Sequence, residues 1–304
     1  MILGAGRGFF SMPKDTSGTT SSSFPAGSLL RQRGLADLFP RLASAAVLMA
    51  AALVSLWLGG LTFDLVWLGA ALAVGYEWQN LIAAPRPRLR FLFAALGICA
   101  SAFFFARGGL WLSGAALAAA AAAAALAAGK GRGIWAFCGI AYAAALLVPV
   151  AALHRSQDFG TQAILWLFAI VWGTDICAYF GGRLIGGPKL WPRISPSKTW
   201  SGTLSGILAG AMLGTLIAGF GPGLKVWVPL LGLGLAAAAI SQAGDIFESW
   251  VKRRFDAKDS SRLIPGHGGF MDRLDGFIAA AAFAALVGAA RGGPSIAAGL
   301  LAWD

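Results

Sequence analysis

The chain has 304 residues, of which 58% are hydrophobic and only 12% are charged, and its mean hydropathy is +0.72. Soluble domains carry about a quarter charged residues. This composition excludes a conventional soluble core and indicates an integral membrane protein. The formal net charge of +11 is explained below by membrane topology, so it does not call for a nucleic-acid partner.

Apolar segments recur along the chain, and a helix of about 20 such residues crosses roughly 30 Å of hydrocarbon. We predict an all-α polytopic membrane protein with about nine transmembrane helices. The predicted spans are 41–60, 62–83, 91–107, 109–128, 134–153, 161–182, 202–220, 227–247 and 277–301. Gly292, Gly293 and Pro294 interrupt the last span, so we expect it to kink or to end early.

Basic residues orient the predicted spans. If the N-terminus is cytoplasmic, twenty Lys and Arg residues fall in inside segments and four in outside segments. This excess agrees with the positive-inside rule, so we expect a cytoplasmic N-terminus. Attraction of the same charges to anionic lipid headgroups is a second and compatible explanation.

Composition divides the chain into three regions. Residues 1–40 are rich in Ser, Thr and Gly and lack periodicity, as in a mobile cytoplasmic tail. Residues 41–160 form an N-terminal transmembrane scaffold with few polar groups. Residues 161–304 carry the polar clusters and form a catalytic transmembrane region with cytoplasmic loops.

Glu77 is the exception within the scaffold. Its carboxylate could complete a polar site at the cytoplasmic face. We favour an interfacial anchor instead, with Tyr76 and Trp78 in the aromatic belt and Glu77 wetted by headgroups.

The segment 249–275 (SWVKRRFDAKDSSRLIPGHGGFMDRLD) combines acids, bases, one His and three Gly. Asp245 lies just before it and shares a helical face with Ser249 and Lys252. A carboxylate near hydrocarbon is costly unless it is paired or metal-bound. A metal ligand, a proton relay, and a salt bridge with Lys252 or Arg253 all remain open for Asp245.

Asp272 and Asp275 are three residues apart and share a face if a helix begins there. Acids in a first helical turn also suit the helix dipole. The more specific hypothesis is that both meet Asp245 across two helices. One or two carboxylates, with substrate phosphates, are what Mg²⁺ requires.

The segment also offers groups that suit polyphosphate. Lys252, Arg253, Lys258, Arg262 and Arg273 could neutralise phosphate charge, although topogenic charge is an alternative. Residues 265–269 permit positive φ and a cradle of amides at Gly268 and Gly269. His267 could donate to a phosphate or shuttle a proton. A plain turn explains the Gly and Pro residues but not the His.

A second polar loop, 181–202, follows Asp175. It lacks the spacing of a P-loop, yet its cations and hydroxyls suit an anion: Lys189, Arg193, Ser195, Ser197, Lys198 and Thr199. Asp175 lies well inside its predicted span and is therefore a functional candidate. The alternative is a buried partner for Thr174 or Tyr179.

The segment 249–275 resembles the signature of the phosphatidate cytidylyltransferase family. The matching positions are Ser249, Lys252-Arg253, Lys258-Asp259, Ser261, Ile264-Pro265, His267-Gly268-Gly269-Phe270 and Asp272-Arg273-Leu274-Asp275. Upstream, the similar positions are Asp175, Ala178-Tyr179-Phe180, Gly182-Arg183, Lys189-Leu190, Pro192 and Ile194-Ser195-Pro196-Ser197-Lys198-Thr199. The family usually has Glu in Lys-Thr-x-Glu-Gly, where this chain has Ser201, and this departure leaves the role of the upstream loop open.

The resemblance implies that CTP and phosphatidic acid give CDP-diacylglycerol and pyrophosphate, with Mg²⁺ held by Asp245 and Asp272. Asp275 and Asp175 are further candidate ligands, and a second cation is an option. The resemblance and the residues together nominate Lys258, His267 and Arg273 as catalytic. Ser195, Ser197, Lys198, Thr199, Lys189, Lys252, Arg253, Gly268 and Gly269 are nominated for phosphate binding.

CTP is soluble and the lipid lies in the bilayer, so we expect the site at the cytoplasmic face of a bacterial inner membrane. The expected partners are CTP, phosphatidic acid and membrane lipids, with a homodimer as a candidate assembly. A CTP-dependent polyprenol or phytol kinase and an ion-coupled transporter are the alternatives.

Overall fold

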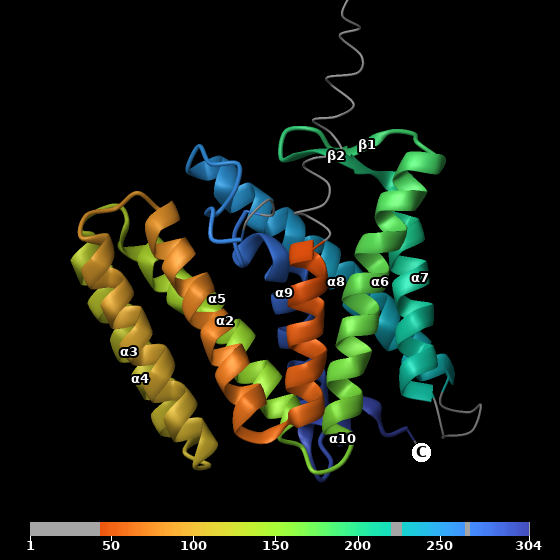
Figure 1. The fold of residues 1–304 in the computed structure, drawn as a ribbon, viewed down its shortest axis with the longest axis horizontal. Helices are drawn as coiled ribbons and strands as arrows, with labels where there is room; N and C mark the ends of the chain where they lie inside the picture. The colour runs from red at the N-terminus through yellow and green to blue at the C-terminus, as the bar shows by residue number, and fades with distance from the viewer. Residues whose placement is uncertain (1–42, 220–226, 265–267, 304) are drawn as a thin grey trace, which may run out of the picture. The chain divides into compact units, whose positions relative to one another are not determined.

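A computed structural model describes residues 43–219, 227–264 and 268–303. Helices dominate this part of the chain (Figure 1). In order, the elements are an apolar helix Ala43–Leu58, α2 (Gly60–Leu81), α3 (Pro87–Ala106), α4 (Leu110–Ala128), α5 (Gly133–His154), α6 (Gly160–Leu184), β1 (Lys189–Trp191), β2 (Ser195–Thr199), α7 (Trp200–Gly219), α8 (Trp227–Arg254), α9 (Met271–Arg291) and α10 (Ile296–Leu301).

Seven of these helices, α3 to α9, are long and apolar enough to cross a membrane. Helix α2 has 22 residues but is not among the seven, and the apolar helix Ala43–Leu58 is shorter. The described residues therefore confirm a polytopic helical membrane protein. The count of nine spans stays a prediction, and the predicted tail, 1–40, lies outside the described residues.

The last predicted span is wrong as a single segment. Helix α9 begins at Met271, before the predicted start at 277, and it ends at Arg291. The φ angles of Gly292 and Gly293 are +71° and +124°, a region that helices do not use, so the chain breaks before α10. The interruption expected at these glycines is thus confirmed.

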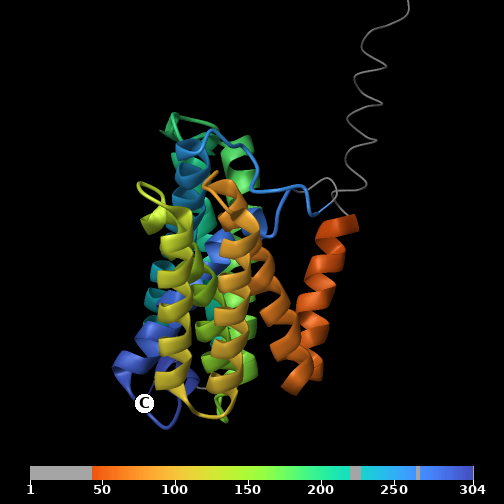
Figure 2. The same cartoon turned by 90° about the vertical axis from the view of Figure 1, so that its left-hand side faces the viewer.

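The loop 181–202 contains a small β-hairpin, which the all-α prediction missed. Strands β1 and β2 pair antiparallel, with Lys189 opposite Thr199 and Trp191 opposite Ser195. The hairpin lies at one end of the helical bundle, together with the loop that follows α8 (Figures 1 and 2). The connections 82–86 and 129–132 lie at the same end, which we call the hairpin end.

Close packing of α7 on α6 holds the hairpin in place. Gly202, Gly206, Gly210 and Gly214 recur every fourth residue along α7 and face α6. A Cβ atom added at Gly206 would lie 2.6 Å from the backbone oxygen of Thr174. Small residues at this spacing allow two membrane helices to approach closely. The two helices that lead into and out of the hairpin are therefore fixed to each other.

Side-chain hydrogen bonds fix α2 against α5 near the hairpin end. Trp78 Nε1 donates to the carbonyl of Trp135, and Gln79 Nε2 donates to that of Ala136, both at 2.8 Å. Buried Arg90 of α3 donates to Gln79 Oε1 at 2.8 Å. These contacts hold the last turns of α2 in one orientation, which bears on Glu77 below.

The α6–α7 contact predicts opposite effects for two Gly-to-Ala changes. Gly206→Ala should destabilise the protein by about 1–3 kcal/mol, because the added methyl group forces α7 away from α6. Gly232→Ala in α8 is the matched control, since nothing lies within 4 Å of its added Cβ atom. It should be neutral or stabilising by up to about 1 kcal/mol, because Ala favours helix. Denaturant titration in detergent measures both, and equal midpoints would contradict the packing argument.

Candidate functional site

The polar residues of the two sequence segments gather at the hairpin end, between α6, α8 and α9. Helices α8 and α9 touch at Gly244 and Gly276, where an added Cβ atom would strike the other helix. The neighbouring residues Asp245 and Asp275 are thereby brought close enough to interact electrostatically. Two glycines thus place two acids at one helix crossing.

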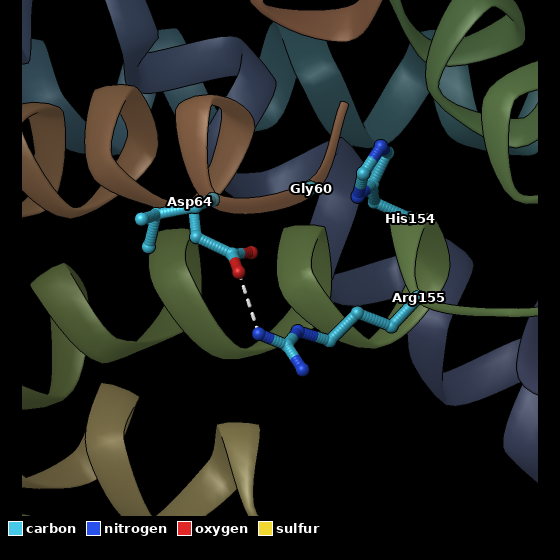
Figure 3. A pocket seen from close by; sticks show the side chains of 5 residues that line it. Gly60, Asp64, His154 and Arg155 are labelled. Carbon is cyan, nitrogen blue, oxygen red and sulfur yellow. Dashed lines mark hydrogen bonds and ion pairs between the residues drawn. The ribbon is translucent and has the colours of Figure 1, made fainter. Parts of the chain in front are cut away.

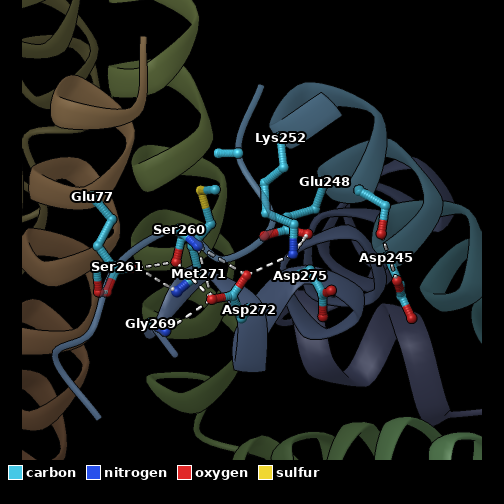
Figure 4. A network of polar contacts seen from close by, with 12 residues as sticks. Glu77, Asp245, Glu248, Lys252, Ser260, Ser261, Gly269, Met271, Asp272 and Asp275 are labelled. Atoms are coloured by element: carbon cyan, nitrogen blue, oxygen red, sulfur yellow. Dashed lines mark hydrogen bonds and ion pairs between the residues drawn. The ribbon is translucent and has the colours of Figure 1, made fainter. Parts of the chain in front are cut away.

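Asp272 lies in the first turn of α9 and is the best-bonded carboxylate of this group (Figure 4). Lys252 Nζ donates to its Oδ1 at 2.6 Å. The backbone N–H of Gly269 donates to Oδ2 at 2.8 Å, and that of Ser260 donates to Oδ2 at 3.0 Å. The Ser260 hydroxyl is also 3.0 Å from Oδ2. Charge-assisted bonds of this kind fix the orientation of a carboxylate.

Lys252 joins Asp272 to Glu248. Its Nζ lies 2.6 Å from Glu248 Oε2, one helical turn away on α8. Glu248 is fully buried, and neither of its oxygens accepts a well-directed hydrogen bond from the described residues. The contact is an ion pair without hydrogen-bond geometry. Glu248 Oε1 therefore has no close partner among the described residues, although Glu248 lies beside Asp272 and Asp275.

Asp245 is paired with Lys198 from β2, not with Lys252 or Arg253, so the salt bridge that was one of its three open explanations is not found. Lys198 Nζ lies 2.6 Å from Asp245 Oδ2 and donates to Gln242 Oε1 at 2.9 Å. Helical spacing reports only neighbours on the same helix, whereas the hairpin brings a cation from another segment.

Asp275 lies between two sets of contacts, which are the Asp272–Lys252–Glu248 group and the Asp245–Lys198 pair. It interacts electrostatically with Asp245, with Glu248 and with Asp175 of α6. Asp175 in turn is within electrostatic reach of Lys198 and Arg273. Neither suggested partner of Asp175 bonds to it in the described part of the chain, since the Tyr179 hydroxyl accepts from Arg183 and Thr174 Oγ1 has no hydrogen-bond partner there.

The described residues contain no group of three His, Cys, Asp or Glu side chains arranged to hold a metal ion. Asp245 and Asp272 lie in two neighbouring networks, each with a Lys ammonium already in contact. Mg²⁺ does not need a complete protein cage, since substrate phosphates and waters complete its shell. Hard carboxylate oxygens and the unpaired Oε1 of Glu248 fit such a cation.

The hairpin presents most of the residues nominated for phosphate binding. Ser197 and Lys189 are exposed and Ser195 is half-buried. Lys189 Nζ donates to the carbonyl of Ser197 at 3.4 Å. The hydroxyl of Thr199 is buried and accepts from the N–H of Gly202 at 3.1 Å, so it caps α7. Thr199 therefore has a structural role, whereas Ser197 and Lys189 are exposed to solvent.

Ser201 takes a structural position where the family usually has Glu. Its hydroxyl donates to the carbonyl of Gly186 and lies 3.2 Å from Thr199 Oγ1. These contacts close the loop around β1 and β2. Ser201 therefore braces the hairpin, and its hydroxyl is not directed at a carboxylate of the site.

The prediction assigned the amides of Gly268 and Gly269 to a phosphate, but one of them binds a carboxylate of the site. Gly268 has φ +81°, so the expected positive φ is confirmed. The N–H of Gly269 is already bonded to Asp272. His267 lies outside the described residues. Lys258, Arg253 and Arg273 are exposed around the turn, and Arg253 also donates to the carbonyl of Ala257 at 3.2 Å.

Glu77 is a member of the site that sequence reasoning placed wrongly. It is not a wetted interfacial anchor, because it is fully buried. Its carboxylate accepts from the hydroxyls of Ser260 and Ser261 and from the N–H groups of Phe270 and Met271. The less favoured alternative, a polar group that completes the site, describes its position. A lone Glu in an apolar segment was the available signal.

A separate cavity of about 540 Å³ lies at the opposite end of the bundle (Figure 3). It is lined by Gly60, Leu61, Asp64, His154 and Arg155. Its two charges neutralise each other, since Arg155 donates to Asp64 at 2.5 Å. None of the nominated residues lies there, so this cavity is not the candidate site.

Comparison with known proteins defines the class of the protein. A model of the cytidylyltransferase family matches residues 39–290, and the chain belongs to this family. Proteins named phosphatidate cytidylyltransferase from Brucella suis biovar 1 (strain 1330) and Brucella melitensis biotype 1 are each 41% identical over 265 residues. That alignment covers 86% of this chain and 97% of each relative. One from Staphylococcus aureus (strain COL) is 39% identical over 146 residues, 47% of this chain and 55% of that protein.

The buried ion pair predicts the effect of removing its cation. Lys252→Met should destabilise the fold by about 3–5 kcal/mol, because Glu248 and Asp272 would lose their shared ammonium. Arg254→Met, at an exposed position two residues away, should change stability by less than about 0.5 kcal/mol. The free energies of unfolding of both variants are measured by denaturant titration in detergent. Equal values for the two variants would contradict the stabilising role of the ion pair.

Proposed function

We propose that this chain is a phosphatidate cytidylyltransferase that makes CDP-diacylglycerol and pyrophosphate from CTP and phosphatidic acid. The observation that carries the proposal is the meeting of Lys198 of the hairpin with Asp245 of α8, beside Asp272 and Asp275 of α9. Cations and carboxylates from the two matched segments thus share one site. Membership of the cytidylyltransferase family and the names of the relatives support the same reaction.

The reaction is a displacement at phosphorus. A phosphate oxygen of phosphatidic acid forms a bond to the α-phosphorus of CTP. The bond from that phosphorus to the oxygen bridging to the β-phosphate breaks, and pyrophosphate leaves with the electron pair. Both reactants are anions, so catalysis depends on alignment and charge neutralisation.

The cations of the site suit this task. Lys198 and Lys252 are fixed by carboxylates at 2.6 Å, which places their ammonium groups before substrate arrives. Lys258, Arg253 and Arg273 are exposed around the same turn and would contact phosphate oxygens. Ser195, Ser197 and Lys189 of the hairpin would approach from the α6–α7 side. His267 stays in the proposal as a phosphate donor.

Asp245 and Asp272 are the carboxylates we propose as ligands of Mg²⁺, with Asp275 and Asp175 beside them. Bound there, Mg²⁺ would neutralise charge on the CTP phosphates. The unpaired Oε1 of Glu248 favours a cation at this place. A second cation is part of the proposal.

We also propose that the hairpin end faces the cytoplasm of a bacterial inner membrane, with nine spans and a cytoplasmic N-terminus. Helix α2 and the apolar helix Ala43–Leu58 would then cross as well. Among the described residues, the Lys and Arg residues at the other end of the bundle are Arg107, Arg155 and Arg291. This asymmetry follows the positive-inside rule. A homodimer is the assembly we would test first.

The function is tested with purified protein in detergent, phosphatidic acid, Mg²⁺ and CTP labelled at the α-phosphate. We expect label in the lipid fraction, release of pyrophosphate, and loss of both with EDTA. Label transferred only from γ-labelled CTP would instead show a lipid kinase. Transfer of neither label would overturn the enzymatic proposal and favour a transporter.

The carboxylates give a sharper test of the same reaction. Asp272→Asn and Asp245→Asn should each lower kcat by about 100-fold or more, since each removes charge from the reacting centre. Asp158→Asn, exposed at the other end of the bundle, is the control and should keep full activity. Full activity of Asp272→Asn would rule out the proposed metal site.

Orientation is tested with a variant in which Ala replaces Cys99, Cys138 and Cys177. A single Cys is then added by Arg193→Cys in the hairpin or by Gln157→Cys at the opposite end. A membrane-impermeant maleimide should label the hairpin position only in inverted membrane vesicles, and the other position only in right-side-out vesicles. The reverse pattern would contradict the proposed orientation.

A further inference from the structure

We propose that Glu77 is a positioning residue for nucleotidyl transfer, acting through Ser260 on the carboxylate of Asp272. The proposal rests on the proposed function, and it assigns a role to α2, which lies far from the matched segments in sequence. The contact joins residues 183 to 194 positions apart. Figure 4 shows Glu77 on one side of Asp272, with Lys252 and Glu248 on the other.

Glu77 accepts four hydrogen bonds from one short stretch of chain. The N–H groups of Phe270 and Met271 donate to it at 2.8 and 2.7 Å, and these are groups at the N-terminus of α9. The hydroxyls of Ser260 and Ser261 donate at 3.0 and 2.7 Å. A carboxylate at a helix N-terminus satisfies free N–H groups and opposes the helix dipole. Glu77 thus caps α9 from a different helix.

The cap reaches Asp272 through a shared hydroxyl. Ser260 Oγ lies 3.0 Å from Glu77 Oε2 and 3.0 Å from Asp272 Oδ2. It carries one proton, so its direction depends on both carboxylates. The N–H groups of consecutive residues then divide between the two acids, with Gly269 bonded to Asp272 and Phe270 to Glu77. If one carboxylate shifts, the neighbouring N–H and O–H groups that donate to the other carboxylate therefore shift as well.

Space at this junction is filled, which leaves the two acids little freedom. A side chain at Gly269 would strike Ser260 Oγ and the Glu77 carboxylate. Glu77 itself cannot follow a moving loop, because its neighbours Trp78 and Gln79 are hydrogen-bonded to α5. The N-terminal helices thus provide a fixed point to which the loop and the first turn of α9 are attached.

Groups that orient a ligand residue commonly change metal affinity or activity by about 10–100-fold when they are removed. Glu77→Gln keeps the size of the side chain but turns one acceptor into a donor, which would face an N–H group. Ser260→Ala removes the hydroxyl shared with Asp272. Ser261→Ala removes a donor to Glu77 that has no bond to Asp272. Comparison of the two Ser variants distinguishes loss of the link to Asp272 from loss of a hydrogen bond to Glu77 only.

The experiment measures each variant of the full chain in detergent in three ways. These are thermal unfolding, hydrogen exchange of residues 258–271 without substrate, and the Mg²⁺ concentration that gives half-maximal nucleotidyl transfer. We expect Glu77→Gln and Ser260→Ala to raise loop exchange at least tenfold and to raise the Mg²⁺ requirement by about 10–100-fold. Ser261→Ala should change the Mg²⁺ requirement less than twofold. If Glu77→Gln does not fold, Ser260→Ala decides the proposal.

Ser101→Ala is the matched structural control, since Ser101 of α3 is as fully buried as Glu77 and its hydroxyl shares a hydrogen bond with Ser113 of α4. It should lower the unfolding temperature without changing loop exchange or the Mg²⁺ requirement. The proposal is overturned if Glu77→Gln and Ser260→Ala behave like Ser101→Ala. Absence of transfer by the unchanged protein would refute the proposed function instead, and loop exchange would still report on Glu77.

Discussion

A carboxylate buried in a helical bundle must be matched by donors or cations, and this requirement organises the hairpin end. Glu77 takes its donors from the loop before α9, Asp272 takes them from Lys252 and the same loop, and Asp245 takes Lys198 from the hairpin. Each pairing joins segments that are distant along the chain. The polar groups of the site itself therefore help to hold these loops in place.

Sequence reasoning predicted much of this arrangement and missed the rest for identifiable reasons. Apolar length located the helices, and the polar segments located Asp245, Asp272 and Asp275 correctly in one region. Pairings between segments stayed hidden, because spacing along one helix says nothing about its neighbours. Glu77 was therefore assigned to the membrane interface, and the only ion-pair partners considered for Asp245 were Lys252 and Arg253 of its own helix.

The predicted scaffold and the predicted catalytic region both contribute to the hairpin end. Helix α2 belongs to the predicted scaffold, yet it supplies the acceptor that holds the first turn of α9. The glycine face of α7 acts similarly for the hairpin, because it ties both ends of that loop to α6. Rigid helices on either side thus set the positions of short polar loops, which is how a site attains precise geometry.

The length of α8 carries a consequence for how two very different substrates meet. Its 28 residues extend for about 42 Å, whereas the hydrocarbon layer is about 30 Å thick. The surplus of roughly two turns ends in Lys252, Arg253 and Arg254. One continuous helix therefore reaches from the acyl-chain layer into the headgroup layer and the water beyond it. A nucleotide and a lipid can contact the same rigid rod without either leaving its own phase.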